Sequence, residues 1–181
     1  IDGLNVPIAV DLLTPETLTA GGRGAELPPH DRGAVRRVPG IELALEDHSL
    51  MHIASLEPTA DDRTFDVHVA GIPALLVAKA YKIGDRLKDG RPTRISDKDA
   101  SDIYRLVVAA NPRAVASALD RLGRSGRVGD TARAGSALLK AQFGAPRSPG
   151  VDMAIRALEG SVVEERLRAV LPAFLRELGP N

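Results

Sequence analysis

A change of hydrophobic period at Gly71 constrains the fold of this chain more than any other feature. From Gly71 onward, apolar residues recur at helical spacing to the end of the sequence. Pro73 suits the first turn of a helix, where its missing N–H group has no intrahelical partner to lose. Segments of helix-breaking residues interrupt this pattern five times, which predicts six helices. These are expected at about residues 72–88, 96–110, 112–123, 128–143, 149–159 and 161–178.

The part of the chain before Gly71 favours strands. Short apolar or alternating runs predict strands at residues 6–13, 41–47, 49–56 and 64–71. The first run holds Asp11 within a buried strand, and the last directs Phe65, Val67 and Val69 inward. Residues 20–40 are rich in Gly, Pro and Arg, which predicts a long surface loop.

These patterns together predict an α+β protein. A β-rich part is expected over residues 1–70 and a helical domain over residues 71–181. Pro172 lies inside the last helical pattern and is expected to kink or split that helix.

Composition excludes several classes of protein. The 24 basic and 24 acidic residues cancel, which argues against a generally basic nucleic-acid-binding surface but leaves room for a local basic cleft, and we expect no reading of DNA. Aromatic residues make up only 3% of the chain, which argues against platforms that stack single-stranded bases. The chain lacks cysteine, a secretory signal and any run of eighteen apolar residues. We therefore expect a cytoplasmic protein that does not enter membranes.

Two consecutive predicted helices carry opposite charges. Lys79, Lys82 and Arg86 share one face of the first helix, and Asp99 and Asp102 share one face of the second. Helices joined by a short turn are commonly antiparallel neighbours, so these faces are expected to meet. The faces then form either interhelical ion pairs or a cleft in which a lysine binds phosphate and an aspartate positions a hydroxyl group.

Simpler interpretations exist for parts of this pattern. Lysine and arginine side chains often lie in solvent, with their stems covering apolar surface. Ser96 could cap the second helix with Asp99 completing a capping box, and Asp97 suits the first turn of a helix. Asp102 has no such explanation, because it lies beyond the first turn.

The segments "AKAYKIGDR" and "DKDASDIYRL", residues 78–86 and 97–106, together resemble motifs of the AbiEii/MenT-type nucleotidyltransferase toxins. That family belongs to the DNA polymerase β-like nucleotidyltransferase superfamily. Lys79 stands at the family's lysine position, and Asp85-Arg86 at its Asp-Arg pair. Lys98-Asp99 stands for its Arg-Asp pair, and Asp102-Ile103-Tyr104 for its Asp-Leu-Tyr.

The resemblance implies a toxin of a toxin–antitoxin system that transfers nucleotides from an NTP to the 3′ end of tRNA. It implies catalytic roles for Lys79, Asp99 and Asp102, and nucleotide binding by Lys82 and Arg86. It also implies Mg²⁺ or Mn²⁺ as the cofactor, with Asp11 as a metal ligand, and a cognate antitoxin protein as partner.

The family's first motif, a Gly-Ser segment followed by an Asp-x-Asp strand, is missing before Asp11. Asp97-Lys98-Asp99 has the Asp-x-Asp pattern, but it lies at the start of a predicted helix. We expect the first motif to lie upstream of Ile1, which would make the chain the larger, C-terminal part of such an enzyme. Two alternatives stay open: a non-catalytic interaction domain, and a nucleotidyltransferase that modifies a small molecule such as an antibiotic.

Overall fold

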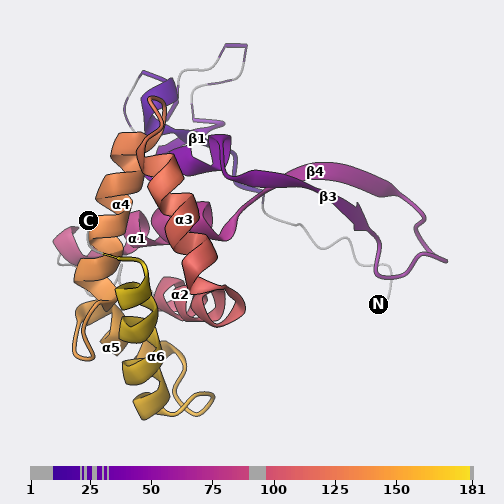
Figure 1. The fold of residues 1–181 in the computed structure, drawn as a ribbon. Coiled ribbons are helices and arrows are strands. Elements are labelled where there is room, and N and C mark those ends of the chain that lie inside the picture. The colour runs from indigo at the N-terminus through magenta and orange to yellow at the C-terminus, as the bar shows by residue number, and fades with distance from the viewer. Residues whose placement is uncertain are drawn as a thin grey trace. The chain divides into compact units, whose positions relative to one another are not determined.

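The protein is described by a computed structural model that covers residues 10–20, 22, 24–25, 28–29, 31, 33–89 and 97–179 (Figure 1). Contacts divide the chain into two compact units, Ile1–Pro39 and Gly40–Asn181. Within the described residues it is an α+β protein, as predicted, with two small sheets and six α-helices. The boundary lies between Pro39 and Gly40, so the part of the chain with the two strands predicted at residues 49–56 and 64–71 and all six helices belong to the second unit.

The first unit contains a short parallel sheet. Strand β1, Leu13–Pro15, pairs with β2, Arg36–Val38, and a 3₁₀-helix, η1, follows β1 at Glu16–Leu18. The expected buried strand at residues 6–13 is wrong in its described part, because residues 10–12 precede β1 and are exposed. Residues 6–9 of that prediction lie outside the described residues. A two-stranded sheet of three residue pairs offers too little surface to bury an apolar run.

The predicted strand at residues 41–47 is a 3₁₀-helix, η2, at Glu42–Leu45. The Glu42 carboxylate accepts a hydrogen bond from the Gly40 N–H at 2.7 Å, next to the start of this helix. Leu43 is fully buried in the helical core. Alternation over so few residues could not distinguish a tight helical turn from a strand.

Strands β3, His48–Ala54, and β4, Thr64–Ala70, form an antiparallel ribbon, which confirms the last two predicted strands. The ribbon projects away from the helices of its unit (Figure 1). The inward direction predicted for Phe65 and Val67 is wrong, since these residues are 60% and 36% exposed. The alternating residues do form a strand, but no other described element packs against the face that carries Phe65 and Val67.

All six predicted helices are confirmed. They are α1 Ile72–Asp89, α2 Lys98–Ala109, α3 Pro112–Gly123, α4 Gly129–Phe143, α5 Pro149–Ala157 and α6 Glu164–Glu177. Asn111 begins α3 by accepting hydrogen bonds from the N–H groups of Arg113 and Ala114, and Pro112 occupies the first helical position. Helix α6 continues through Pro172, so it is not split there.

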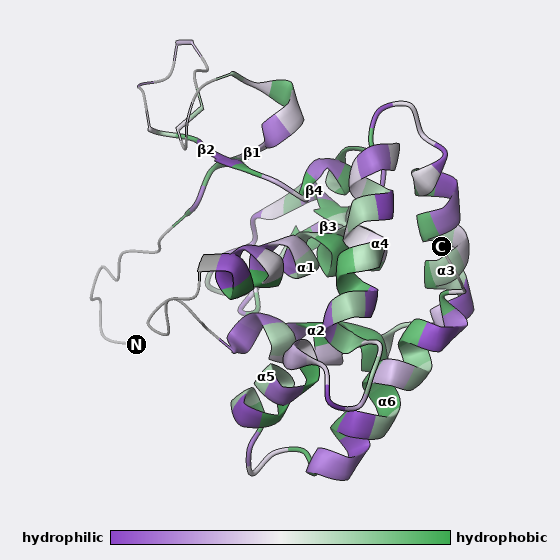
Figure 2. Ribbon diagram, turned by 90° about the vertical axis from the view of Figure 1, so that its left-hand side faces the viewer, coloured by the Kyte–Doolittle hydropathy of each residue, from purple (hydrophilic) through white to green (hydrophobic). Residues whose placement is uncertain are grey.

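Helix α1 lies at the centre of the apolar core. Its residues Leu76, Val77, Ala80 and Ile83 are at most 1% exposed. They belong to one cluster with apolar residues of the five other helices and of η2. Polar and apolar residues alternate around the helices, as amphipathic packing requires (Figure 2). Among the described helices, none has the length and apolar character needed to cross a membrane.

The start of α1 is held by a side chain from an earlier segment. Asp47 Oδ2 accepts a hydrogen bond from the Ala74 N–H at 2.8 Å, and the Asp47 carbonyl accepts one from the Gly71 N–H at 2.8 Å. A side chain at Gly71 would collide with this carboxylate, because its Cβ would lie 2.5 Å from Asp47 Oδ2. The N-terminus of the helix that carries the charged face therefore depends on Asp47.

We expect Asp47→Ala to lower the free energy of unfolding by about 1 kcal/mol, as removal of a helix cap does. Urea denaturation followed by circular dichroism measures the change. Asp62→Ala is the matched control, since Asp62 is exposed in the loop between β3 and β4 and should leave stability nearly unchanged. Equal effects of the two substitutions would contradict a capping role for Asp47.

Candidate functional site

Helices α1 and α2 bring five charged residues together, which we call the charge cluster: Lys79, Lys82, Arg86, Asp99 and Asp102. Lys79 Nζ lies 3.0 Å from Asp99 Oδ1 and 2.6 Å from Asp102 Oδ2. Lys82 Nζ lies 3.1 Å from Asp99 Oδ1, and Arg86 pairs with Asp99 Oδ2. Later residues of α1 thus meet earlier residues of α2, as in antiparallel helices. The predicted meeting of the two charged faces is confirmed.

Asp99 is the centre of this cluster. Its side chain is only 4% exposed, and its two oxygens accept hydrogen bonds from three cationic side chains. A carboxylate this deeply buried needs such partners, because burial of an unpaired charge costs several kcal/mol. Asp99 is therefore fixed between the helices with both oxygens engaged.

The capping interpretation of this helix start finds no support in the described contacts. Asp97 occupies the N-cap position of α2 but makes no capping hydrogen bond with its side chain. Asp97 instead binds Arg156 of α5 in a two-bond pair, at 2.9 and 3.0 Å. Ser96, the expected partner in a capping box, lies outside the described residues. Asp99 and Asp97 both serve contacts between helices.

Asp102 lies nearer to solvent than Asp99. Its side chain is 25% exposed, and while Oδ2 binds Lys79, Oδ1 accepts a hydrogen bond from Arg105 at 2.9 Å. Arg105 was not predicted as a site residue, although its position three residues after Asp102 on the same helix is the signal that could have identified it. Tyr104, from the same motif, is buried in the core and contributes to packing.

Cationic groups outnumber carboxylates in the contacts described for the cluster. With Arg105 included, four cationic groups surround two carboxylates. Lys82 is the most exposed of the three α1 cations, at 54%, while Lys79 and Arg86 are 27% and 18% exposed. A lysine ammonium offers three donors, so Lys82 can bind a further anion while it remains near Asp99. The cluster can therefore hold an anion at the solvent side of α1.

Neighbouring charges shift the pKa values of three members of the cluster. Burial disfavours the charged form of each, but hydrogen bonds and opposite charges outweigh it. Asp102 and Asp99 raise the pKa of Lys79 above its ordinary value. Lys79 and Lys82 lower the pKa of Asp99, and Lys79 and Arg105 lower the pKa of Asp102. Lys79, Asp99 and Asp102 are therefore all ionised at neutral pH.

The stabilising effect of the cluster is expected to depend on pH at both extremes. Asp102 has a folded-state pKa below its ordinary value of 3.8, so its contribution is complete above about pH 4 and is lost as pH falls through the folded pKa. Lys79 has a pKa raised above 10.5, so its contribution is complete below that pH and is lost as pH rises through the folded pKa. Urea denaturation of wild type and Asp102→Asn should show a stability difference at pH 7 that shrinks below pH 4. A stability difference that does not change with pH would contradict the proposed contribution of the ionised Asp102 carboxylate.

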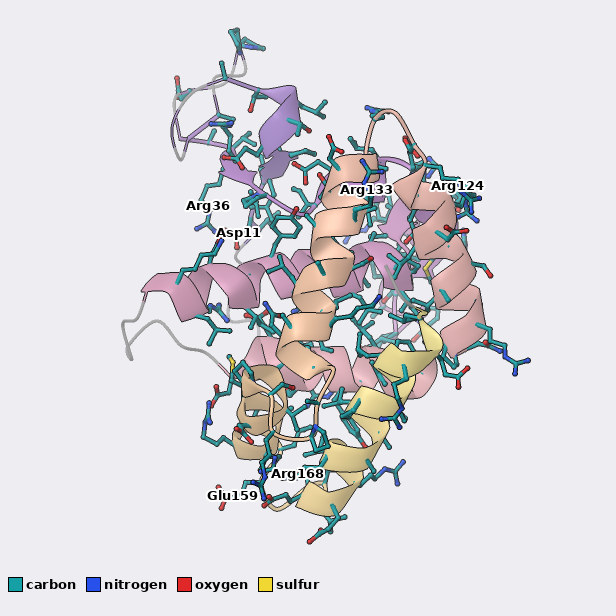
Figure 3. All side chains as sticks on the ribbon, turned by 60° about the vertical axis from the view of Figure 1, so that its left-hand side comes forward. Asp11, Arg36, Arg124, Arg133, Glu159 and Arg168 are labelled. Carbon is teal, nitrogen blue, oxygen red and sulfur yellow. The ribbon has the colours of Figure 1, made fainter. Side chains whose placement is uncertain are left out.

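The structure places Asp11 in the first unit, outside any strand. Its side chain is 71% exposed, and Arg36 Nη2 lies 2.7 Å from Asp11 Oδ1 (Figure 3). The expectation that Asp11 is buried in a strand is wrong, since β1 begins two residues later. Its role as a metal ligand stays a prediction that rests on the resemblance alone.

The described residues do not fit a magnesium site. They contain no group of three or more acidic, histidine or cysteine side chains arranged to hold a metal ion. The best-placed carboxylate, Asp99, already has both oxygens engaged by cations. A metal ion at this position would have to displace Lys79, Lys82 or Arg86.

A separate groove of about 610 Å³ lies along α3 and α4 near the end of α6. Its cations are engaged with neighbours: Arg124 and Arg133, both labelled in Figure 3, pair with Asp120 and Asp130 respectively, and Lys140 donates a hydrogen bond to the Gly179 carbonyl. No buried carboxylate organises these groups as Asp99 organises the charge cluster. The charge cluster is therefore the stronger candidate site.

Comparisons with protein-family models, with curated proteins and with solved structures found no match to this chain.

Proposed function

We propose that the chain acts in a nucleotidyltransferase toxin, which transfers nucleotides from an NTP to the 3′ end of tRNA. The observation that supports this most is the charge cluster, in which a buried aspartate holds three cations and one of them, Lys82, remains half exposed. A triphosphate carries several negative charges at close spacing, and a rigid group of lysine and arginine side chains suits it.

In this proposal the cations bind the nucleotide. Lys82 and Arg86 contact the triphosphate, and Lys79 acts as a point charge near the phosphate that reacts. Asp99 and Asp102 position these cations, since their carboxylates already hold Lys79 and its neighbours in place. The cluster is thus organised before the substrate arrives, which lowers the cost of ordering long side chains on binding.

The reaction is an in-line displacement at the α-phosphorus. The 3′-hydroxyl oxygen of the acceptor forms a bond to phosphorus and its proton passes to solvent water, while the bond to the bridging oxygen breaks and pyrophosphate leaves with the electron pair. A divalent cation, Mg²⁺ or Mn²⁺ in the family that the motifs resemble, would neutralise charge on the phosphates. Asp11 keeps its proposed role as a ligand of that ion, which rests on the resemblance alone, while both oxygens of Asp99 are already engaged by cations.

The remaining parts of the proposal come from the resemblance. The acceptor would be tRNA in the cytoplasm, and a cognate antitoxin would bind the toxin and block it. The charge cluster gives no reason to prefer one nucleotide base or one tRNA.

Binding of a labelled NTP to Lys82→Ala tests the proposal. We expect a loss of about tenfold in affinity, because one exposed cation is removed while Asp99 keeps two others, and tenfold corresponds to about 1.4 kcal/mol. Lys88→Ala is the matched control: Lys88 is an exposed lysine on the same helix, outside the cluster. An equal loss in both variants would indicate general charge attraction instead of a site, and a wild-type chain that binds no NTP would contradict the proposal.

A non-catalytic interaction domain is the second candidate, and one observation favours it. Both oxygens of Asp99 are already engaged by cations, as in an ion-pair cluster that only joins helices. This alternative predicts no NTP binding by the wild-type chain. A small-molecule nucleotidyltransferase differs only in its acceptor, and transfer of α-phosphate label to RNA or to a small hydroxyl compound distinguishes it.

A further inference from the structure

The β3–β4 ribbon has one apolar face and one polar face. Residues directly opposite in an antiparallel pair share a face, so the register from His48↔Ala70 to Ala54↔Thr64 assigns every side chain. One face carries mainly apolar side chains: Met51, Ile53, Phe65, Val67 and Val69, with Ser49. The other face carries His48, Leu50, His52, Asp66 and His68 with three smaller residues. Contacts within the polar face agree with this assignment, since His52 pairs with Asp66 and the His48 and His68 rings touch.

The outer edge of β4 presents unpaired backbone groups. Gly71 donates a hydrogen bond to the Asp47 carbonyl, which makes these two residues a hydrogen-bonded pair just beyond the ribbon. Hydrogen-bonded and non-hydrogen-bonded pairs alternate in an antiparallel ladder, so Val69, Val67 and Phe65 point their backbone groups toward β3. The backbone groups of Thr64, Asp66, His68 and Ala70 then point outward. No strand of the described residues pairs with this edge.

This edge lacks most of the features that normally prevent strand pairing, and Asp66 is its one acidic residue. Proteins protect free edges with lysines, prolines, bulges or very short strands. Strand β4 contains no lysine, arginine or proline, and all seven of its residues pair in regular register without a bulge. An isolated two-stranded ribbon with both faces in water is also only marginally stable, and a further strand would stabilise it.

We propose that β4 pairs with β4 of a second copy of the chain, antiparallel and centred on Val67. This register uses all four outward-pointing residues of each strand: Asp66 lies opposite His68 of the second copy, and Thr64 opposite Ala70. Each imidazole N–H can donate to the facing carboxylate, because Asp66 uses only Oδ1 for His52 and is 62% exposed. The apolar faces join as well, with Val67 beside Val67 and Phe65 beside Val69.

Charge selects this register and this partner. In a register centred on Asp66, the Asp66 carboxylates of the two copies lie opposite each other. In a register centred on His68, the two His68 side chains face each other and Asp66 faces Ala70, so no acid lies opposite a histidine. Pairing of β3 with β3 in the register that uses all four of its outward-pointing residues is centred on Met51 and brings Leu50 opposite His52, with no acid between the two strands. Pairing of β4 with β3 of another copy would leave a free strand edge at each end of the assembly, so further copies could add without limit. The arrangement centred on Val67 closes with two-fold symmetry.

Val67→Cys and Met51→Cys form a matched test of this geometry. The chain has no native cysteine, so each variant carries a single thiol. In the proposed dimer the two Val67 residues form a non-hydrogen-bonded pair with Cα atoms about 4.5 Å apart, within the range of a disulfide. Met51 lies directly opposite Val67 on the same face, but two copies of it are separated by three strand spacings, about 14 Å. Mild oxidation should therefore link Val67→Cys into a covalent dimer and leave Met51→Cys unlinked.

Light scattering with size exclusion supplies the second measurement. We expect the wild-type chain to show twice its mass of 19.1 kDa, and Val67→Lys to show the monomer mass, because two lysines would meet at the axis. Met51→Lys removes an apolar side chain from the same face away from the axis and should remain dimeric. A monomeric wild-type chain at about 100 µM, or equal cross-linking of the two cysteine variants, would overturn the proposal, and so would a Val67→Lys chain that stays dimeric. Circular dichroism of each variant confirms that it is folded.

Discussion

Asp99→Asn is expected to lower the free energy of unfolding by about 3 kcal/mol, the low end of the range for breaking a buried ion pair. The substitution keeps the size of the side chain but removes the negative charge that holds Lys79, Lys82 and Arg86. Three cations would then lie close together with Asp102 as the remaining carboxylate of the cluster. Urea denaturation at pH 7 measures the loss, and an unchanged m-value would confirm that the unfolding transition is otherwise the same.

Asp97→Asn is the control for that experiment. Asp97 also joins two helices, but its partner Arg156 is 56% exposed, and solvent-exposed pairs contribute about 1 kcal/mol or less. If Asp99→Asn lowers the free energy of unfolding no more than Asp97→Asn does, burial of Asp99 does not strengthen the contribution of its ion pairs to stability. Measuring NTP binding on the same two proteins separates the two possible roles of Asp99. If a folded Asp99→Asn chain binds NTP normally, Asp99 stabilises the fold but does not position cations for the nucleotide.

The helical part of the fold could be predicted because its signals are local. Breaker segments separate the helices, and Asn111-Pro112 provides both a cap and a first-turn proline for α3. The meeting of α1 and α2 could also be predicted, since charges three and four residues apart must share a face of a helix. The geometry of Lys79 with Asp99 and Asp102 follows from that spacing once the two helices are antiparallel.

The choice between capping and ion pairing at Asp99 could not be made from sequence. An acid in the first turn of a helix suits both roles, and only the position of α1 decides between them. The link between Asp97 and Arg156 was missed for the same reason, because the two residues lie 59 positions apart and share no motif.

The N-terminal third was harder to predict because strands depend on distant partners. The alternation at residues 41–47 fitted a strand, yet η2 forms there around the Glu42 contact with Gly40. Apolar residues near Asp11 suggested a buried strand, but a run of this length does not show what covers it. The ribbon illustrates the same limit: its period of two was correct, while the burial of Phe65 was not.

Gly135→Ala is expected to lower the free energy of unfolding by about 2 kcal/mol. Helices α1 and α4 approach closely there, and a Cβ on Gly135 would lie 2.4 Å from Val77 Cγ1 and 2.9 Å from Cγ2. Val77 is fully buried and β-branched, so it has one favoured rotamer in a helix and cannot turn away. Overpacking of this kind costs up to about 3 kcal/mol, and it outweighs the gain of about 1 kcal/mol that alanine brings to a helix.

A double-mutant cycle with Val77→Ala identifies this contact as the cause. Val77→Ala alone is expected to cost about 2 kcal/mol by leaving a cavity, but it also removes both methyl groups that collide with the new Cβ. The double variant should therefore be no less stable than Val77→Ala alone, which gives a coupling energy of about 2 kcal/mol. Gly123→Ala is the control with room for a methyl group, since its nearest neighbour would be at 3.7 Å, and it should not destabilise the protein. If the two single losses simply added, the collision between α4 and α1 would not be what makes glycine necessary at residue 135.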